Sequence, residues 1–190
     1  MNNVLLNTEG GIATVTVNRP ESLNALTLDI VNEIDQAFAS IEKDSSVVVA
    51  VLTGAGEKAF IAGADIGIFL TLDQASAQAG SRLGQAVCDK IAYCGVPVIA
   101  AVNGFAFGGG MEFALACDIR LATENAMFGQ QEVLWGNFPG WGGSQRLPWL
   151  VGRSDAMKII LTGDPITALE AYRIGLVSGV YPQSEFRQRV

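Results

Sequence analysis

The sequence has no histidine among its 190 residues. Histidine is the commonest general base near neutral pH and the commonest metal ligand in proteins. Its absence rules out a Ser-His-Asp or Cys-His catalytic arrangement within this chain. No metal site is expected either.

Cysteine and charge are also scarce. The three cysteines, Cys88, Cys94 and Cys117, form no C-x-x-C motif, and an odd count of this kind fits a reduced, cytosolic protein. We interpret them as small buried hydrophobes rather than reactive thiols. Only 16% of the residues are charged, and the net charge is −7. An acidic chain is a poor candidate for binding nucleic acid or an anionic membrane.

Long uninterrupted hydrophobic runs are missing too. The first ten residues, MNNVLLNTEG, contain neither the basic region nor the apolar run of a signal peptide. The most apolar window, 96–117, is broken by Asn103, four glycines and Glu112, so it does not fit a membrane span. We therefore expect a cytoplasmic protein with no membrane segment.

What remains is an apolar chain with a mixed helix and strand pattern. Hydrophobic residues make up 49%, which predicts a large core and some apolar surface covered by a partner subunit. An apolar strand, a glycine-rich turn and a helix recur, which indicates an α/β chain of ββα-like turns in a single domain, 1–190. The expected strands are 4–7 and 12–17 (a hairpin), 47–54, 96–104, 118–123 and 175–181; the expected helices are 27–43, 73–93, 142–150, 154–162 and 167–174.

Common nucleotide and hydrolase motifs do not explain the glycines. GAGEKA (54–59) matches G-x-G-x-x-A, but a loop continues where the dinucleotide fingerprint requires a helix. Neither a P-loop nor a G-x-S-x-G motif occurs in the sequence.

Two glycine-rich loops follow the two continuous apolar runs, 47–54 and 96–104, that we expect to be buried strands. IAGADI (61–66) comes after the first, and GFAFGGGME (104–112) comes after the second. If the strands are neighbours, both loops emerge at one edge of the sheet. Their backbone N–H groups could then converge on one point and form an oxyanion hole. The alternative is a pair of ordinary tight turns.

Two carboxylates stand among apolar residues near these loops. Glu112 begins an otherwise apolar helix, and Glu132 lies in FGQQEVLWG. Burial raises a carboxyl pKa, and two carboxyls in one pocket can divide into an acid and a base. The alternatives are a carboxylate favoured by a helix N-terminus for Glu112 and a solvated residue for Glu132.

These segments resemble a known family. The blocks AFIAGADI, NGFAFGGGMEFALACD and FGQQEVLWGNFPGWGGSQRL are similar to the signatures of the crotonase, or enoyl-CoA hydratase/isomerase, superfamily. VTVNRPESLNAL and LTGDPITALEAYRIGLVSGVYP resemble its outer blocks, so the resemblance covers nearly the whole chain. It implies the crotonase fold, a spiral of ββα turns that is also found in ClpP.

The resemblance also implies roles for individual residues. The N–H groups of Ala64 and Gly109 would hold the thioester oxygen of an acyl-CoA and stabilise an enolate. Glu112 and Glu132 would hold a water between them, which favours hydration of a 2-enoyl-CoA. Gly140 would help to position that water.

The resemblance implies further contacts with coenzyme A. Ala62, Ala64, Asp65 and Ile66 would line its path. Arg19 and Lys58 are candidates for binding its phosphates. The CoA thioester is the substrate, and no separate cofactor is expected.

Three positions depart from the family pattern. Gly67 stands where a charged residue is common, and Gln131 stands where proline often precedes the second glutamate. Trp141 replaces a residue that is commonly small. We interpret Trp141 either as an element of acyl specificity or as a core side chain.

The resemblance leaves assembly and reaction type partly open. Family members usually continue past YPQSEF with C-terminal helices that cap the acyl pocket and help trimers to form, whereas this sequence stops at Val190. The chain is then a fragment, a truncated form or a naturally short member. We expect a homo-oligomer, a trimer or a dimer of trimers. An isomerase, another enolate-forming enzyme and a non-catalytic acyl-CoA-binding subunit remain the alternatives to a hydratase.

Overall fold

Two β-sheets form the framework of the structure, a computed structural model that describes residues 3–65, 67 and 73–190. The larger sheet has the strand order β1-β2-β3-β5-β7-β10, and the smaller one has the order β4-β6-β8-β9. The strands of the larger sheet are β1 (Val4–Glu9), β2 (Ile12–Val17), β3 (Val49–Gly54), β5 (Val98–Val102), β7 (Ile119–Thr123) and β10 (Gly179–Tyr181). Those of the smaller sheet are β4 (Ala59–Ile61), β6 (Phe105–Phe107), β8 (Met127–Gly129) and β9 (Ile166–Thr167).

The predicted N-terminal hairpin is confirmed. β1 pairs antiparallel with β2, from Val4 opposite Val17 to Glu9 opposite Ile12. Ala13, Val15 and Val17 alternate along β2 and are fully buried, as expected for a strand with one face on the core. From β2 onward, each neighbouring pair in the larger sheet is parallel.

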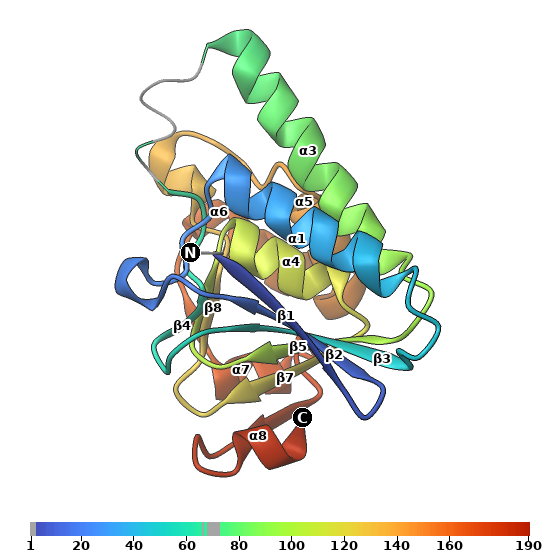
Figure 1. Cartoon of the computed structure of the whole chain (residues 1–190). Coiled ribbons are helices and arrows are strands. Elements are labelled where there is room, and N and C mark those ends of the chain that lie inside the picture. Colours follow the sequence, from blue (N-terminus) through green and yellow to red (C-terminus); the bar gives the residue numbers. More distant parts are fainter. Residues whose placement is uncertain (1–2, 66, 68–72) are drawn as a thin grey trace.

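Helices cover one face of the larger sheet, with α1, α3 and α4 lying side by side above it (Figure 1). Thr27 caps α1 by accepting a hydrogen bond from the N–H of Ile30. Asp73 caps α3 in a capping box with Ser76. The helices are α1 (Leu28–Ile41), α3 (Gln74–Ala92), α4 (Gly109–Ala116), α5 (Gly143–Val151), α6 (Arg153–Thr162), α7 (Ala168–Arg173) and α8 (Phe186–Arg189), with short 3-10 turns η1 (Pro20–Ser22) and η2 (Glu132–Trp135).

Each turn of the spiral contains one strand more than the apolar runs alone indicated. A strand of the larger sheet leads into a three-residue strand of the smaller sheet and then into a helix: β3–β4–α3, β5–β6–α4 and β7–β8–α5. The sequence predicted no strand between the one that ends at 54 and the helix that begins at 73, and this was wrong, since β4 lies within that segment. It also made the strand at 47–54 too long by two residues and the strands at 96–104 and 175–181 too long by four each.

A buried arginine fixes the C-terminal end of α4. Arg120 is 6% exposed, and its guanidinium donates hydrogen bonds to the carbonyls of Leu176, Ala114 and Cys117. Burial lowers the pKa of this guanidinium. Because a cation at a helix C-terminus interacts favourably with the helix dipole, Arg120 holds α4 while leaving its N-terminal end free for the site.

The cysteines behave as small apolar side chains. Cys88 and Cys117 are buried in the core, and Cys94 is half-buried. Burial raises the pKa of the Cys117 thiol to about 12, and it also raises the pKa of the Cys88 thiol. A reactive role for these two buried thiols is therefore disfavoured.

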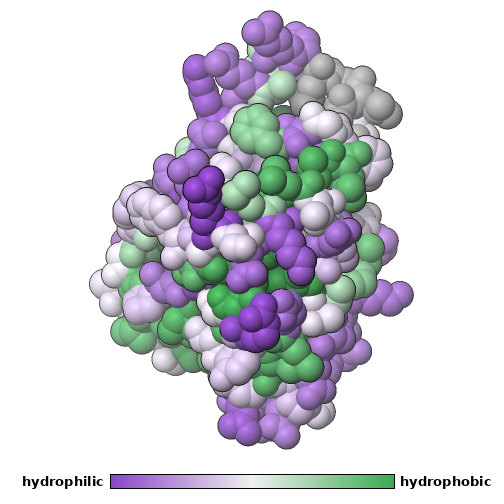
Figure 2. Space-filling model, turned by 180° about the vertical axis from the view of Figure 1, so that it is seen from behind, coloured by the Kyte–Doolittle hydropathy of each residue, from purple (hydrophilic) through white to green (hydrophobic). Residues whose placement is uncertain are grey.

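The surface carries large apolar side chains among polar ones. Trp135, Phe138, Trp149 and Leu169 are each at least 68% exposed. The face opposite that of Figure 1 shows apolar areas divided by polar side chains (Figure 2). In the part of the chain that the structure describes, no helix combines the length and the apolar character required to cross a membrane.

Candidate active site

The two glycine-rich loops converge, as the sequence predicted. β3 and β5 are parallel neighbours, and so are their continuations β4 and β6. Both loops therefore leave the sheets at the same edge. Gly63 faces the carbonyl of Phe107, since a Cβ added at Gly63 would lie 3.2 Å from that oxygen.

Glycine is required where the loops touch. A Cβ at Gly110 would overlap the carbonyl of Ile61, so only glycine allows α4 to pack against β4 so closely. Gly108, the N-cap of α4, has a φ of 50°, a positive value that residues with a side chain disfavour. These requirements bring the N-terminal end of α4 against the first loop.

Ala64 and Gly109 contribute one backbone N–H each at this junction. Ala64 is held in a parallel bridge to Leu26, in which Leu26 donates to the carbonyl of Gly63 and Asp65 donates to the carbonyl of Leu26, both at 2.8 Å. Gly109 is the first residue of α4, where an N–H has no partner within the helix. Neither N–H donates to an acceptor within residues 3–65, 67 and 73–190.

The other residues predicted to line the CoA path belong to the first loop. Ala62 donates its N–H to the carbonyl of Leu23 and is half-buried. The side chain of Asp65 accepts a hydrogen bond from the N–H of Gly67 at 3.1 Å. Ile66, which the sequence also assigned to this path, lies outside the described residues.

Glu112 is buried at the N-terminal end of α4. Its side chain is 2% exposed, and its Oε1 accepts hydrogen bonds from the N–H groups of Trp141 (2.7 Å) and Gly143 (2.8 Å). Burial raises the pKa of Glu112 to about 7, the nearby Glu132 adds to that rise, and the two N–H groups oppose it. Glu112 thus binds the loop after η2 and does not cap its own helix.

Glu132 begins η2 and lies at the same junction. Its carboxylate is next to Gly108, because a Cβ there would lie 3.4 Å from Oε1 of Glu132. Burial raises the pKa of Glu132 to about 7. The structure therefore brings together the two carboxylates that the sequence singled out, in surroundings that raise the pKa of each.

Gln130 is a site residue that sequence reasoning missed. It is fully buried, and the amide orientation that satisfies its hydrogen bonds directs its nitrogen to both oxygens of Glu132, at 2.9 and 3.1 Å. The available signal was a polar residue directly after an apolar strand, two positions before the glutamate. We find no corresponding contact for Gln131 among the residues described.

Gly140 and Trp141 follow on the loop that contacts Glu112. The carbonyl of Gly140 accepts hydrogen bonds from Gln85 (2.7 Å) and Ser81 (3.4 Å), both on α3. The indole of Trp141 packs on Phe113 with ring centroids 5.5 Å apart. This loop is therefore fixed to α3 on one side and to α4 on the other.

Arg146 is a second residue that the sequence did not indicate. It donates to the carbonyl of Trp141 at 3.0 Å and forms an ion pair with Asp89 at 2.6 Å. Its positive charge lowers the pKa of Glu112. Arg146 thus acts on the buried carboxylate without contacting it.

The two residues predicted to bind the phosphates of coenzyme A, Arg19 and Lys58, differ in their contacts. The guanidinium of Arg19 donates to the carbonyl of Ala25 at 3.1 Å, within the turn that precedes α1. Lys58 is exposed, and its carbonyl accepts the N–H of Phe105.

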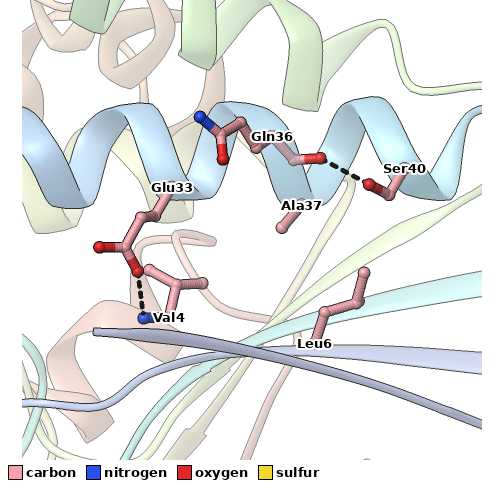
Figure 3. Close-up of a pocket in the computed structure, with 6 residues that line it drawn as sticks. All are labelled: Val4, Leu6, Glu33, Gln36, Ala37 and Ser40. Atoms are coloured by element: carbon pink, nitrogen blue, oxygen red, sulfur yellow. Dashed lines mark hydrogen bonds between the residues drawn. The ribbon is translucent and has the colours of Figure 1, made fainter. Parts of the chain in front are cut away.

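A hollow elsewhere on the molecule does not belong to this site. It lies between β1 and α1, and Val4, Leu6, Glu33, Gln36, Ala37 and Ser40 line it (Figure 3). Glu33 accepts a hydrogen bond there from the N–H of Val4 at 2.9 Å (Figure 3). That bond ties the first strand to α1 and has a structural role.

Comparison with known proteins identifies the family. The family model described as enoyl-CoA hydratase/isomerase matches residues 7–190. The chain belongs to the enoyl-CoA hydratase/isomerase family. The expected crotonase fold is confirmed by the solved enoyl-CoA hydratase of Bacillus anthracis, which superimposes with a TM-score of 0.95 and 35% identity, over 99% of this chain and 73% of that one.

Relatives of this enoyl-CoA hydratase/isomerase family member are similar over nearly its whole length. The short-chain-enoyl-CoA hydratase of Clostridium acetobutylicum is 50% identical, over 97% of this chain and 71% of that protein. The crotonyl-CoA hydratase of Syntrophomonas wolfei is 46% identical, over 99% of this chain and 72% of that protein.

Proposed function

We propose that this protein is an enoyl-CoA hydratase, a lyase that adds water across the double bond of a 2-enoyl-CoA to give a 3-hydroxyacyl-CoA. The observation that carries this proposal is the pair of carboxylates, buried Glu112 and half-buried Glu132, each with a pKa of about 7. They lie beside the backbone N–H of Gly109, where two glycine-rich loops meet. The similarity to hydratases of other organisms supports the same reaction.

The N–H groups of Ala64 and Gly109 bind the thioester oxygen in this proposal. Addition of hydroxide at the β-carbon moves negative charge onto that oxygen and forms an enolate. Donors that are already oriented stabilise such charge without reorganising, and one such donor is typically worth about 3–4 kcal/mol in an acyl-transfer enzyme. The absence of an acceptor for either N–H among the residues described is consistent with this role.

The two glutamates divide the proton transfers. Ionised Glu112 takes one proton from water while the water oxygen bonds to the β-carbon, and protonated Glu132 gives its proton to the α-carbon. The product has gained one H and one OH, and proton exchange with solvent restores the starting states. A carboxyl with a pKa near 7 can both accept and donate a proton at neutral pH, because the best general acids and bases have a pKa close to the working pH.

The test is the loss of the conjugated enoyl-thioester absorbance of 2-butenoyl-CoA. We expect Glu112→Gln and Glu132→Gln each to lower kcat by at least about 100-fold, the lower range for a general acid or base. Exposed Glu57→Gln is the matched control and should leave kcat unchanged. A folded wild-type protein that hydrates no 2-enoyl-CoA would contradict the proposal.

The same assay separates the alternatives. If 3-enoyl-CoA is converted to 2-enoyl-CoA and no hydration occurs, the protein is an isomerase. If acyl-CoA binds in calorimetry without turnover, it is a binding subunit. The presence of two carboxylates at the loop junction favours hydration, which uses both an acid and a base.

We also propose that the protein acts as a homo-oligomer built on trimers. The support is the exposure of large apolar side chains, with Trp149 88% exposed and Leu169 70% exposed. Apolar surface of this kind is typical of subunit interfaces. Light scattering during size-exclusion chromatography would give the mass, and a monomer of 20.0 kDa would exclude this assembly for the chain.

A further inference from the structure

The indole of Trp141 occupies a slot between two glycines on different helices. Gly84 lies within α3, and a Cβ at that position would overlap the indole ring. Gly109 begins α4, and a Cβ there would lie 2.6 Å from Cζ3 and 2.9 Å from Cε3 of the ring. The ring therefore lies in close contact with the backbone of both helices.

Gly84 has no conformational reason to be glycine. It lies in the middle of the 19-residue helix α3, where glycine costs about 1 kcal/mol relative to alanine. It is also absent from the residues whose φ is positive. The contact with the indole supplies the reason, because no other residue type leaves room for the ring.

The backbone of Trp141 is hydrogen-bonded to Glu112, the proposed base. Its N–H binds Oε1 of Glu112 at 2.7 Å, and its carbonyl accepts a hydrogen bond from Arg146 at 3.0 Å. The ring also packs on Phe113, one residue after Glu112 along α4. The indole is thus held at a constant distance from the reacting groups.

We propose that Trp141 and Gly84 together determine the acyl length that the site accepts, and that they restrict it to short, unbranched 2-enoyl groups such as butenoyl. The inference rests on the proposed function. The edge of the indole lies against Gly109, whose N–H holds the thioester oxygen in that proposal. The acyl carbons beyond the double bond then meet a rigid apolar wall that is fixed from both sides.

The geometry explains why both residues are needed. Trp141 provides the wall, and Gly84 sets how far the wall can withdraw from the acyl group. A side chain at position 84 would push the indole toward Gly109 and the thioester. A small residue at position 141 would leave a space between α3 and α4 that additional acyl carbons could enter.

The experiment compares kcat/KM for 2-octenoyl-CoA and 2-butenoyl-CoA. We expect Trp141→Ala to raise the ratio of the octenoyl to the butenoyl value at least tenfold, since a hydrophobic pocket discriminates about 10–200-fold for one methylene. Trp141→Phe should raise it by less. Gly84→Ala should lower kcat/KM for both substrates. In the double variant with Trp141→Ala, Gly84→Ala should cause no such loss, because the indole that it would displace is absent.

Gly80→Ala is the matched control on the same helix. A Cβ there meets only Leu28, at an ordinary contact distance of 3.5 Å, so both kcat/KM values should stay at the wild-type level. The inference is overturned if the wild-type protein hydrates butenoyl-CoA but Trp141→Ala and Trp141→Phe leave the ratio unchanged. It is also overturned if Gly84→Ala costs as much in the Trp141→Ala background as in the wild-type background. A wild-type protein inactive on every 2-enoyl-CoA would instead refute the proposed function.

If Trp141→Ala does not fold, the ratio of the octenoyl to the butenoyl value in Trp141→Phe still decides the question. A readout without turnover adds a check: titration calorimetry with saturated octanoyl-CoA and butanoyl-CoA. Tighter binding of octanoyl-CoA by the Trp141 variants supports the inference. Equal changes in affinity for octanoyl-CoA and butanoyl-CoA contradict it.

Discussion

Replacing Glu112 with glutamine should stabilise the folded protein above neutral pH while it removes the proposed base. Burial raises the pKa of Glu112 from an ordinary 4.5 to about 7. Between these two values the folded chain binds more protons at this position than the unfolded chain does. The contribution of Glu112 to the free energy of unfolding is therefore fully present below about pH 4.5 and is lost as pH rises through about 7.

The magnitude follows from the two pKa values. Because each pKa unit corresponds to about 1.4 kcal/mol, ionised Glu112 destabilises the folded state by about 3 kcal/mol at alkaline pH. Glutamine cannot ionise, and its carbonyl oxygen can still accept the N–H groups of Trp141 and Gly143. The stability difference between Glu112→Gln and the wild type should therefore increase by about 2–3 kcal/mol from pH 5 to pH 9.

Urea unfolding at pH 5, 7 and 9 measures this difference. In a thermal scan at pH 9, the variant should melt about 5–10 °C above the wild type, given about 2–4 °C per kcal/mol for a chain of this size. Exposed Glu57→Gln should change stability by no more than about 0.5 kcal/mol at any of these pH values. A Glu112→Gln effect that is the same at pH 5 and pH 9 would refute the reasoning, and so would a loss of stability at pH 9.

Two further predictions test how the site is held. Arg146→Met removes the positive charge that lowers the pKa of Glu112, so the acidic limb of the kcat/KM profile against pH should move to higher pH, whereas Asp89→Asn should not move it upward. Asn103→Ala removes hydrogen bonds to the carbonyls of Gly54 (2.8 Å) and Gly56 (2.7 Å) between the two converging strands. Leaving these acceptors unpaired should lower the free energy of unfolding in urea by about 1–3 kcal/mol.

The long elements of the fold could be predicted because their patterns extend over many residues. The buried face of α1 repeats through Ile30, Ile34, Phe38 and Ile41, which is a helical spacing. The short strands β4, β6 and β8 have three residues each, too few to show an alternation. They exist because a neighbouring strand of the smaller sheet pairs with each of them, and that pairing depends on the tertiary fold.

The candidate site was predictable to the extent that its residues are unusual in their own segments. Glycines in an apolar run and a glutamate in an apolar helix are costly, so they indicated Gly109 and Glu112. Arg146 is ordinary in sequence, and the only local signal for Gln130 is its place directly after an apolar strand. Their importance comes from contacts made across the fold, such as the ion pair of Arg146 with Asp89, and no local pattern contains that information.

The proton affinity of Glu112 results from two opposed effects of the same loop. Packing of the loop over α4 buries the carboxylate and raises its pKa, while the N–H groups of Trp141 and Gly143 lower it. Burial alone would keep the carboxyl protonated and unable to accept a proton at neutral pH. If the carboxylate accepted the same hydrogen bonds while exposed to water, its pKa would be low and it would be a weak base. A pKa of about 7 requires both, and the loop that carries Trp141 supplies both. The residue that limits the acyl group in our inference therefore belongs to the segment that also tunes the base.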